Sequence, residues 1–117
     1  MRESILKNKS YEFSIRIVRL SQFLVSEHRE FVLSKQVLRS GTSIGALVRE
    51  AEYGQSRADF RNKMSIALKE ANVTGYSSSL LKDTGYINEK LFVSLSDDCV
   101  ELMKMLIATV KTTRPVR

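Results

Sequence analysis

The stretch SKQVLRSGTSIGALVREAEY, residues 34–53, decides the fold class of this chain. Small and apolar residues recur there every three or four positions, a spacing that keeps them on one side of an α-helix. They are Val37, Gly41, Ile44, Val48 and Ala51. Ser34 is a suitable N-cap residue and Tyr53-Gly54 supplies a stop, so the stretch predicts one helix over residues 34–53.

The middle of this predicted helix, Ser40-Gly41-Thr42-Ser43-Ile44-Gly45-Ala46, is rich in small residues. A glycine inside a helix costs up to about 1 kcal/mol relative to alanine. Small side chains also remove the bulk that normally keeps two helices apart. We therefore expect another helix to approach closely at this segment.

Apolar residues with the same spacing occur on both sides of this stretch. They form three further sets: Phe13, Ile17, Leu20 and Leu24; Phe60, Met64, Ala67, Ala71 and Leu81; and Leu91, Leu95, Cys99, Leu102 and Leu106. The residues Ser56 to Asp59 resemble a capping box at the start of a helix. Gly85 indicates the end of that helix, and Asn88 indicates the start of the next one. The predicted helices cover about residues 10–27, 34–53, 57–84 and 89–112. They indicate an all-α, antiparallel up-down-up-down four-helix bundle that forms a single domain over residues 1–117.

Two of the predicted helices are apolar over a wider arc than one seam of a bundle uses. The second apolar line of helix 10–27 consists of Tyr11, Ile15, Val18 and Val25. That of helix 89–112 consists of Phe92, Val100, Met103, Ile107 and Val110. These lines predict that the helices touch more than one neighbour and that the protein forms an oligomer.

The composition excludes several other classes of protein. Five Gly and one Pro in 117 residues are too few for a turn-rich β-sandwich or barrel. The single cysteine, Cys99, cannot form a disulfide within the chain, and its place on an apolar stripe predicts a buried thiol. No apolar stretch approaches the roughly 18 residues of a membrane span, and no signal-peptide core is present. We therefore expect a soluble protein of the reducing cytoplasm.

The residues that support catalysis or metal binding are scarce. The only histidine, His28, stands in a charged segment after the first predicted helix, where we expect a solvated residue. A di-iron bundle would need two inward-facing Glu-x-x-His motifs, and zinc would need several Cys or His ligands. Neither pattern exists, and no phosphate-binding loop follows a strand. We expect a protein without catalysis, cofactor or metal.

Positive charge is the remaining functional signal. The chain has 19 Lys and Arg against 13 Asp and Glu, a net charge of +6. On helix 34–53 the cations lie on the side opposite Ile44 and Val48, with little acid on the same helix. The candidate nucleic-acid-binding residues are Lys35, Arg39 and Arg49, together with Arg57 and Arg61 one turn apart in the next helix. An ordinary solvated surface, or a structural or adaptor oligomer with a protein partner, is the alternative.

The segment Arg39 to Ala46 also carries a family resemblance, together with Gln55 to Phe60 and Met64 to Asn72. Here the chain resembles the four-helix-bundle proteins called 23S ribosomal RNA intervening-sequence proteins, from about Phe13 to Thr112. The family is similar in fold to the accessory variability proteins of diversity-generating retroelements. That resemblance implies a homopentamer of antiparallel bundles with an RNA or DNA partner and no known catalysis.

The sequence departs from the family pattern in two places. Leu47 stands where relatives usually carry Asn. Val73, Gly75 and Ser77 stand where relatives often carry acidic residues and a Trp. Because Gly and Ser lower helix propensity, we expect the third helix to be weaker or locally bent around residues 73–79.

Overall fold

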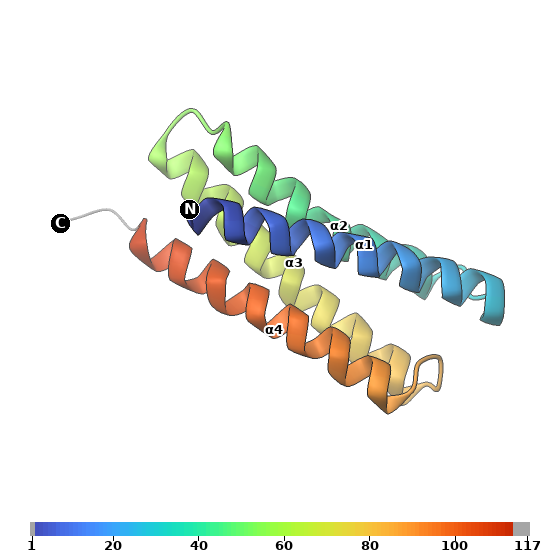
Figure 1. Cartoon of the computed structure of the whole chain (residues 1–117). Coiled ribbons are helices and arrows are strands. Elements are labelled where there is room, and N and C mark those ends of the chain that lie inside the picture. Colours follow the sequence, from blue (N-terminus) through green and yellow to red (C-terminus); the bar gives the residue numbers. More distant parts are fainter. Residues whose placement is uncertain (1, 114–117) are drawn as a thin grey trace.

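Four α-helices make up the computed structural model, which describes residues 2–113 (Figure 1). They are α1 (Arg2–His28), α2 (Leu33–Glu52), α3 (Arg57–Asp83) and α4 (Glu89–Thr112). Each helix packs against the next along the chain and runs in the opposite direction, which confirms the predicted antiparallel bundle. Residue 1 and residues 114–117 of the predicted domain lie outside the described part.

The first helix begins far earlier than predicted, at Arg2 instead of near residue 10. Leu6 lies seven residues before Phe13 on the same side of the helix and is buried at 4% exposure. Ser10 lies inside α1, and its hydroxyl donates to the carbonyl oxygen of Lys7 at 3.0 Å, as a serine inside a helix commonly does. The predicted start was too late because the seven-residue spacing from Leu6 to Phe13 was not followed back along the chain.

The start of α2 also differs from the prediction, because Ser34 lies inside the helix and is not its N-cap. The Glu30 carboxylate caps the helix instead by accepting a hydrogen bond from Ser34 N at 2.8 Å. Two effects act on the pKa of the Glu30 carboxyl group. Desolvation raises this pKa, but hydrogen bonds from the backbone N–H groups of Ser34, Leu33 and Val32 have the larger combined effect, so the pKa lies below its ordinary value. The other two caps follow the expected chemistry, with Ser56 accepting from Asp59 N and Asn88 accepting from Leu91 N.

The predicted apolar stripes form the core. Nearly all of their members are buried, while Phe60 and Leu91 are half-buried against the core. Gly41 and Gly45 bring α2 close to α1, as expected. A Cβ atom at Gly41 would lie 2.7 Å from Ile17 Cγ1, and one at Gly45 would lie 3.2 Å from the Ser10 carbonyl oxygen.

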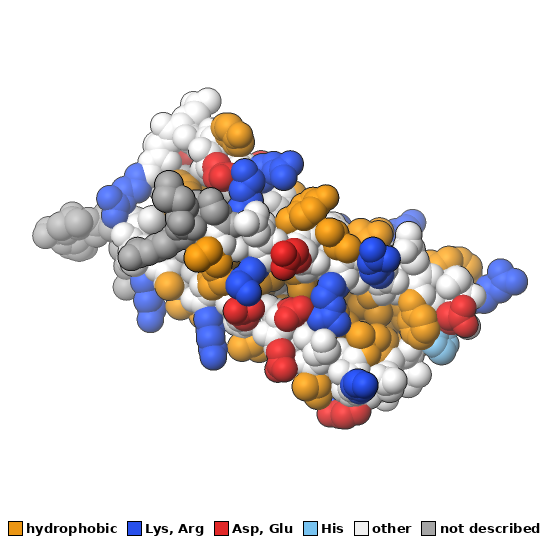
Figure 2. All heavy atoms as spheres, viewed as in Figure 1, with side chains coloured by type: hydrophobic (Ala, Val, Ile, Leu, Met, Phe, Trp, Pro, Cys, Tyr) orange, Lys and Arg blue, Asp and Glu red, His pale blue; other side chains and the backbone are white. Residues whose placement is uncertain are grey.

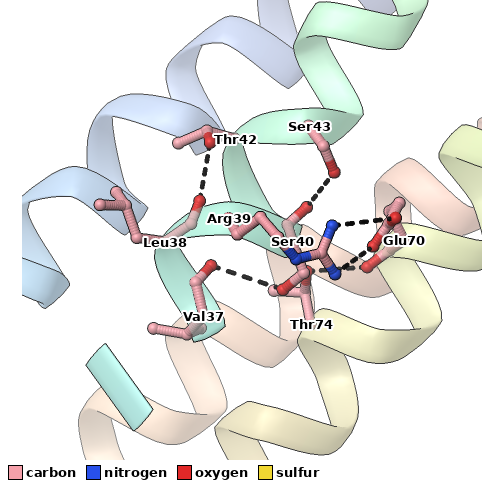
Figure 3. Close-up of polar contacts among 8 residues, drawn as sticks. All are labelled: Val37, Leu38, Arg39, Ser40, Thr42, Ser43, Glu70 and Thr74. Atoms are coloured by element: carbon pink, nitrogen blue, oxygen red, sulfur yellow. Dashed lines mark hydrogen bonds and ion pairs between the residues drawn. The ribbon is translucent and has the colours of Figure 1, made fainter. Parts of the chain in front are cut away.

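A buried polar contact joins α2 to α3 (Figure 3). Ser40 and Thr74 are fully buried, and the Thr74 hydroxyl lies 3.0 Å from that of Ser40. Thr74 Oγ1 also lies 2.8 Å from the carbonyl oxygen of Glu70. Because buried hydroxyls need partners, this contact favours one register of α2 against α3.

The third helix is not interrupted at the departures from the family pattern. It continues through residues 73–79, and a Cβ atom at Gly75 would meet nothing within 4 Å. The helix is therefore continuous through the segment where we expected a weaker or bent helix. Reduced helix stability in this segment stays a prediction.

The second apolar line of α1 stays exposed within the described chain. Tyr11, Ile15, Val18 and Val25 are between 38% and 59% exposed. On α4 the second line is divided, since Val100 and Ile107 are exposed while Phe92, Met103 and Val110 pack partly against the core. Figure 2 shows hydrophobic side chains among charged ones on this side of the bundle.

Helices α1 and α4 contact each other least among adjacent helices. Two ion pairs join them, Arg16 to Asp98 at 2.7 Å and Lys9 to Glu101 at 3.3 Å. The bundle is therefore held mainly by the contacts of α1 with α2, α2 with α3, and α3 with α4.

Candidate nucleic-acid interface

The outer side of α2 carries three of the predicted cations. Lys35, Arg39 and Arg49 are exposed, and the residues opposite them, Ile44 and Val48, are buried. At 1.5 Å per residue the cations extend over about 21 Å of the helix. Lys35 and Arg49 make no ion pair with any residue from 5 to 113, the range whose side chains the structure describes.

Arg39 differs from the other two because a neighbouring helix supplies its counterion. Its guanidinium binds both carboxylate oxygens of Glu70 on α3, at 3.2 and 3.3 Å (Figure 3). The Arg39 side chain is 63% exposed, whereas that of Glu70 is only 14% exposed. Arg39 therefore presents its guanidinium to solvent while it neutralises a mostly buried carboxylate.

Arg57 and Arg61 lie on the side of α3 that faces α4, away from the cations of α2. Arg57 donates to the carbonyl oxygens of Thr112 and Thr113 at 3.0 and 3.3 Å, which satisfies two groups at the end of α4. Arg61 is half-buried, and its Nε has no hydrogen-bond partner among the described residues. The five candidates therefore form two separate groups.

An open groove of about 1120 Å³ surrounds Arg49, between α1, α2 and the start of α3. It brings Arg49 together with two other cations, Lys7 and Lys63. Two tyrosines, Tyr11 and Tyr53, line the same groove and are 59% and 79% exposed. The site therefore combines three cations with two carboxylates, Glu50 and Asp59, and two aromatic side chains.

Only part of the positive charge in this groove is free. Lys7 pairs with Glu52 at 3.2 Å, and Lys63 pairs with Glu50 at 3.4 Å. The carboxylate of Asp59 accepts a hydrogen bond from Gln55 N at 3.4 Å, at the turn before α3. Among the side chains described, residues 5–113, the Arg49 guanidinium is consequently the lining cation that makes no ion pair.

Sequence reasoning missed Lys7, Tyr11 and Lys63 as members of this site. Lys7 lay outside the predicted helix, and Tyr11 had been assigned only to the second apolar line of that helix. The heptad spacing of Leu6 and Phe13 was the available signal that α1 extends far enough to place Lys7 beside α2.

Cys99 is a buried packing residue, as predicted. Burial raises the pKa of its thiol to about 11, with a further contribution from the Asp98 carboxylate. Its Sγ donates to the carbonyl oxygen of Ala71 at 3.2 Å. A thiol with a raised pKa is a poor nucleophile.

The described residues contain no group of three or more side chains placed to bind a metal ion. Within the same range no helix is long and apolar enough to cross a membrane. His28 is exposed, as expected, but it ends α1 and does not lie in a connection.

Comparison with known proteins identifies the family. The sequence profile described as 23S rRNA-intervening sequence protein matches residues 2–108. The chain belongs to this family. A crystal structure from the S23 ribosomal protein family, of a Bacteroides thetaiotaomicron VPI-5482 protein with unknown function, is 56% identical. The match covers 95% of this chain and 99% of that one, with a TM-score of 0.93, while no functionally curated protein matches.

The structure gives a packing reason for the segment that carries the resemblance to the 23S rRNA-intervening sequence proteins. In residues 39–46, Gly41 and Gly45 face α1, while Ser40 bonds with Thr74 of α3. Most of this segment therefore holds three helices together. Arg39 is the charged residue of this segment, and its side chain is 63% exposed.

Proposed function

We propose that this 23S rRNA-intervening sequence protein is a non-enzymatic, oligomeric protein of the cytoplasm that binds the phosphate backbone of RNA or DNA. The observation that supports this most directly is the row of cations on the outer side of α2. Lys35 and Arg49 make no ion pair among residues 5–113, and Arg39 is exposed although it is paired with Glu70. Lysine and arginine side chains arranged in this way neutralise phosphates and release counterions.

The size of the row predicts how binding depends on salt. A length of about 21 Å corresponds to about six phosphates of one strand at 3.4 Å each. Three contacts predict a slope of about −3 for duplex DNA and about −2 for a single strand in a plot of log affinity against log salt. Larger slopes would indicate that several subunits bind one strand.

Anisotropy titrations with labelled RNA and DNA between 50 and 200 mM salt test this proposal. The double variant Lys35→Glu/Arg49→Glu should weaken binding at least about tenfold, because each lost phosphate contact removes released counterions. Lys90→Glu/Lys104→Glu on α4 is the matched control, since it makes the same change of charge on an exposed, mixed surface. Absence of binding at 50 mM salt, or an equal loss in the control, would contradict the proposal.

The exposed apolar lines support the oligomeric part of the proposal. Val18 and Val25 on α1 are seven residues apart, as are Val100 and Ile107 on α4, and all four are exposed. A seven-residue repeat of apolar positions suits packing against a further helix. The number five comes from the family resemblance alone.

Light scattering at micromolar concentration should give a mass that is a multiple of 13.3 kDa, about five-fold for a pentamer. Val18→Glu should reduce this mass, because a charge in an apolar contact must lose its water. Gln22→Glu, an exposed polar position on α1, should leave the mass unchanged. A 13.3 kDa species from the unaltered chain would contradict oligomer formation.

The same exposed lines favour a second candidate function, a structural or adaptor oligomer that binds a protein. The charge-reversal experiment distinguishes the two. Loss of nucleic-acid affinity in Lys35→Glu/Arg49→Glu with an intact oligomer supports the first function. An intact oligomer with no affinity for RNA or DNA in the unaltered protein supports the second.

A further inference from the structure

The groove at Arg49 has features that phosphate binding alone does not require. We propose that it accepts an unpaired nucleotide of a single strand, with the base stacked on Tyr11 or Tyr53 and the neighbouring phosphate at Arg49. The inference rests on the proposed nucleic-acid function and adds the class of nucleic acid to it.

The two tyrosines are the first support for this site. They come from different elements, Tyr11 from α1 and Tyr53 from the end of α2, and line one groove. Neither ring stacks on another aromatic ring of the described chain, where the ring contacts involve Phe23, His28 and Tyr86. Exposed aromatic rings beside a basic surface are the usual means of binding unpaired bases, because every base has a flat π-face.

The distribution of charge is the second support. Lys7 pairs with Glu52 and Lys63 pairs with Glu50, and Asp59 also lines the groove, so the Arg49 guanidinium is the lining cation without an ion pair among residues 5–113. One such cation in a groove that two tyrosines line suits one phosphate next to a base. It does not suit the continuous phosphate rows of a duplex, whose bases are already stacked inside.

The shape of the groove is the third support. Two small residues, Gly45 and Ala46, form part of its wall. Its volume of about 1120 Å³ is slightly above the range of ordinary ligand sites, about 300–1,000 Å³. The groove is also open to solvent, so a strand can enter and leave it.

The experiment compares three labelled ligands with the full chain at 50 mM salt: a ten-residue uridine strand, an abasic strand of equal length, and a duplex. The chain has four Tyr and no Trp, so quenching of tyrosine fluorescence reports stacking directly. We expect the uridine strand to quench this fluorescence and to bind at least tenfold more tightly than the abasic strand.

Variants then assign the stacking to particular residues. Tyr11→Leu/Tyr53→Leu should remove the tenfold preference, whereas Tyr11→Phe/Tyr53→Phe should keep it because phenylalanine still stacks. Tyr76→Leu, at a 67% exposed tyrosine on α3, is the matched control and should change nothing. Circular dichroism and light scattering of each variant separate lost stacking from lost folding or assembly.

Equal affinity for the uridine and abasic strands, or an unchanged preference in the leucine variant, would overturn this inference. The proposed function survives that result if Lys35→Glu/Arg49→Glu still weakens binding of both strands. If no strand binds, both fail. Saturation of the quenching by free uridine monophosphate at the same concentration would also overturn the inference, because a small nucleotide would then be the occupant.

Discussion

Ile17→Ala is expected to lower the free energy of unfolding by about 2–5 kcal/mol, the range found when a large buried aliphatic side chain is removed. Ile17 is 0% exposed and fills the contact between α1 and α2. Its Cγ1 and Cγ2 atoms lie 2.7 and 2.8 Å from the position that a Cβ atom of Gly41 would take, so both helices lose contacts with its removal. The helix backbones cannot move closer to close the cavity without displacing the neighbouring Gly45 contact with Ser10.

Urea unfolding followed by circular dichroism measures this effect. All variants must be compared at one protein concentration, because assembly would add to the apparent stability. Gln22→Ala, an exposed position on the same helix, is the control and should change the free energy by less than about 0.5 kcal/mol. A loss below about 1 kcal/mol for Ile17→Ala would show that α1 and α2 are not packed as described.

Gly41→Val is expected to destabilise the protein by about 1–3 kcal/mol, because it overfills the same contact. Even a methyl group at this position would lie 2.7 and 2.8 Å from the two γ carbons of Ile17. Ile17 is branched at Cβ, so its side chain has few other rotamers to adopt. Intrinsic helix propensity has the opposite sign, since valine favours a helix more than glycine does.

Gly75→Ala provides the control for this prediction. Gly75 also lies inside a helix, but a Cβ atom there would meet nothing within 4 Å. Helix propensity therefore predicts a gain of about 0.5–1 kcal/mol, measured by the same urea unfolding. Equal effects at the two glycines would contradict the close approach of α1 and α2.

Much of the fold is predictable because helical periodicity is strong and local. The stripe from Val37 to Ala51 and its counterparts in the other helices are the observed core, and the connections at 29–32, 53–56 and 84–88 fall within one residue of the predicted ones. The errors occur at helix starts. Ser34 was predicted to be an N-cap, but it lies within α2 and its hydroxyl bonds to the carbonyl oxygen of Glu30, four residues earlier. A serine at a cap and a serine inside a helix look the same in a sequence.

The candidate site is predictable only in part. The positions of Lys35, Arg39 and Arg49 on one side of α2 follow from the rotation of about 100° per residue. Their surroundings do not follow from it. Glu70 reaches Arg39 from α3, and Tyr11 reaches the groove of Arg49 from α1.

The amino-acid sequence alone determined the number of helices, their buried sides and the exposure of the α2 cations, since each of these depends on spacing within one helix. The tertiary structure decided which charges are neutralised and which aromatic rings share a groove with Arg49. Those contacts depend on the register and separation of neighbouring helices. Gly41 against Ile17 and Ser40 against Thr74 set that register, through contacts between residues 24 and 34 positions apart in the chain.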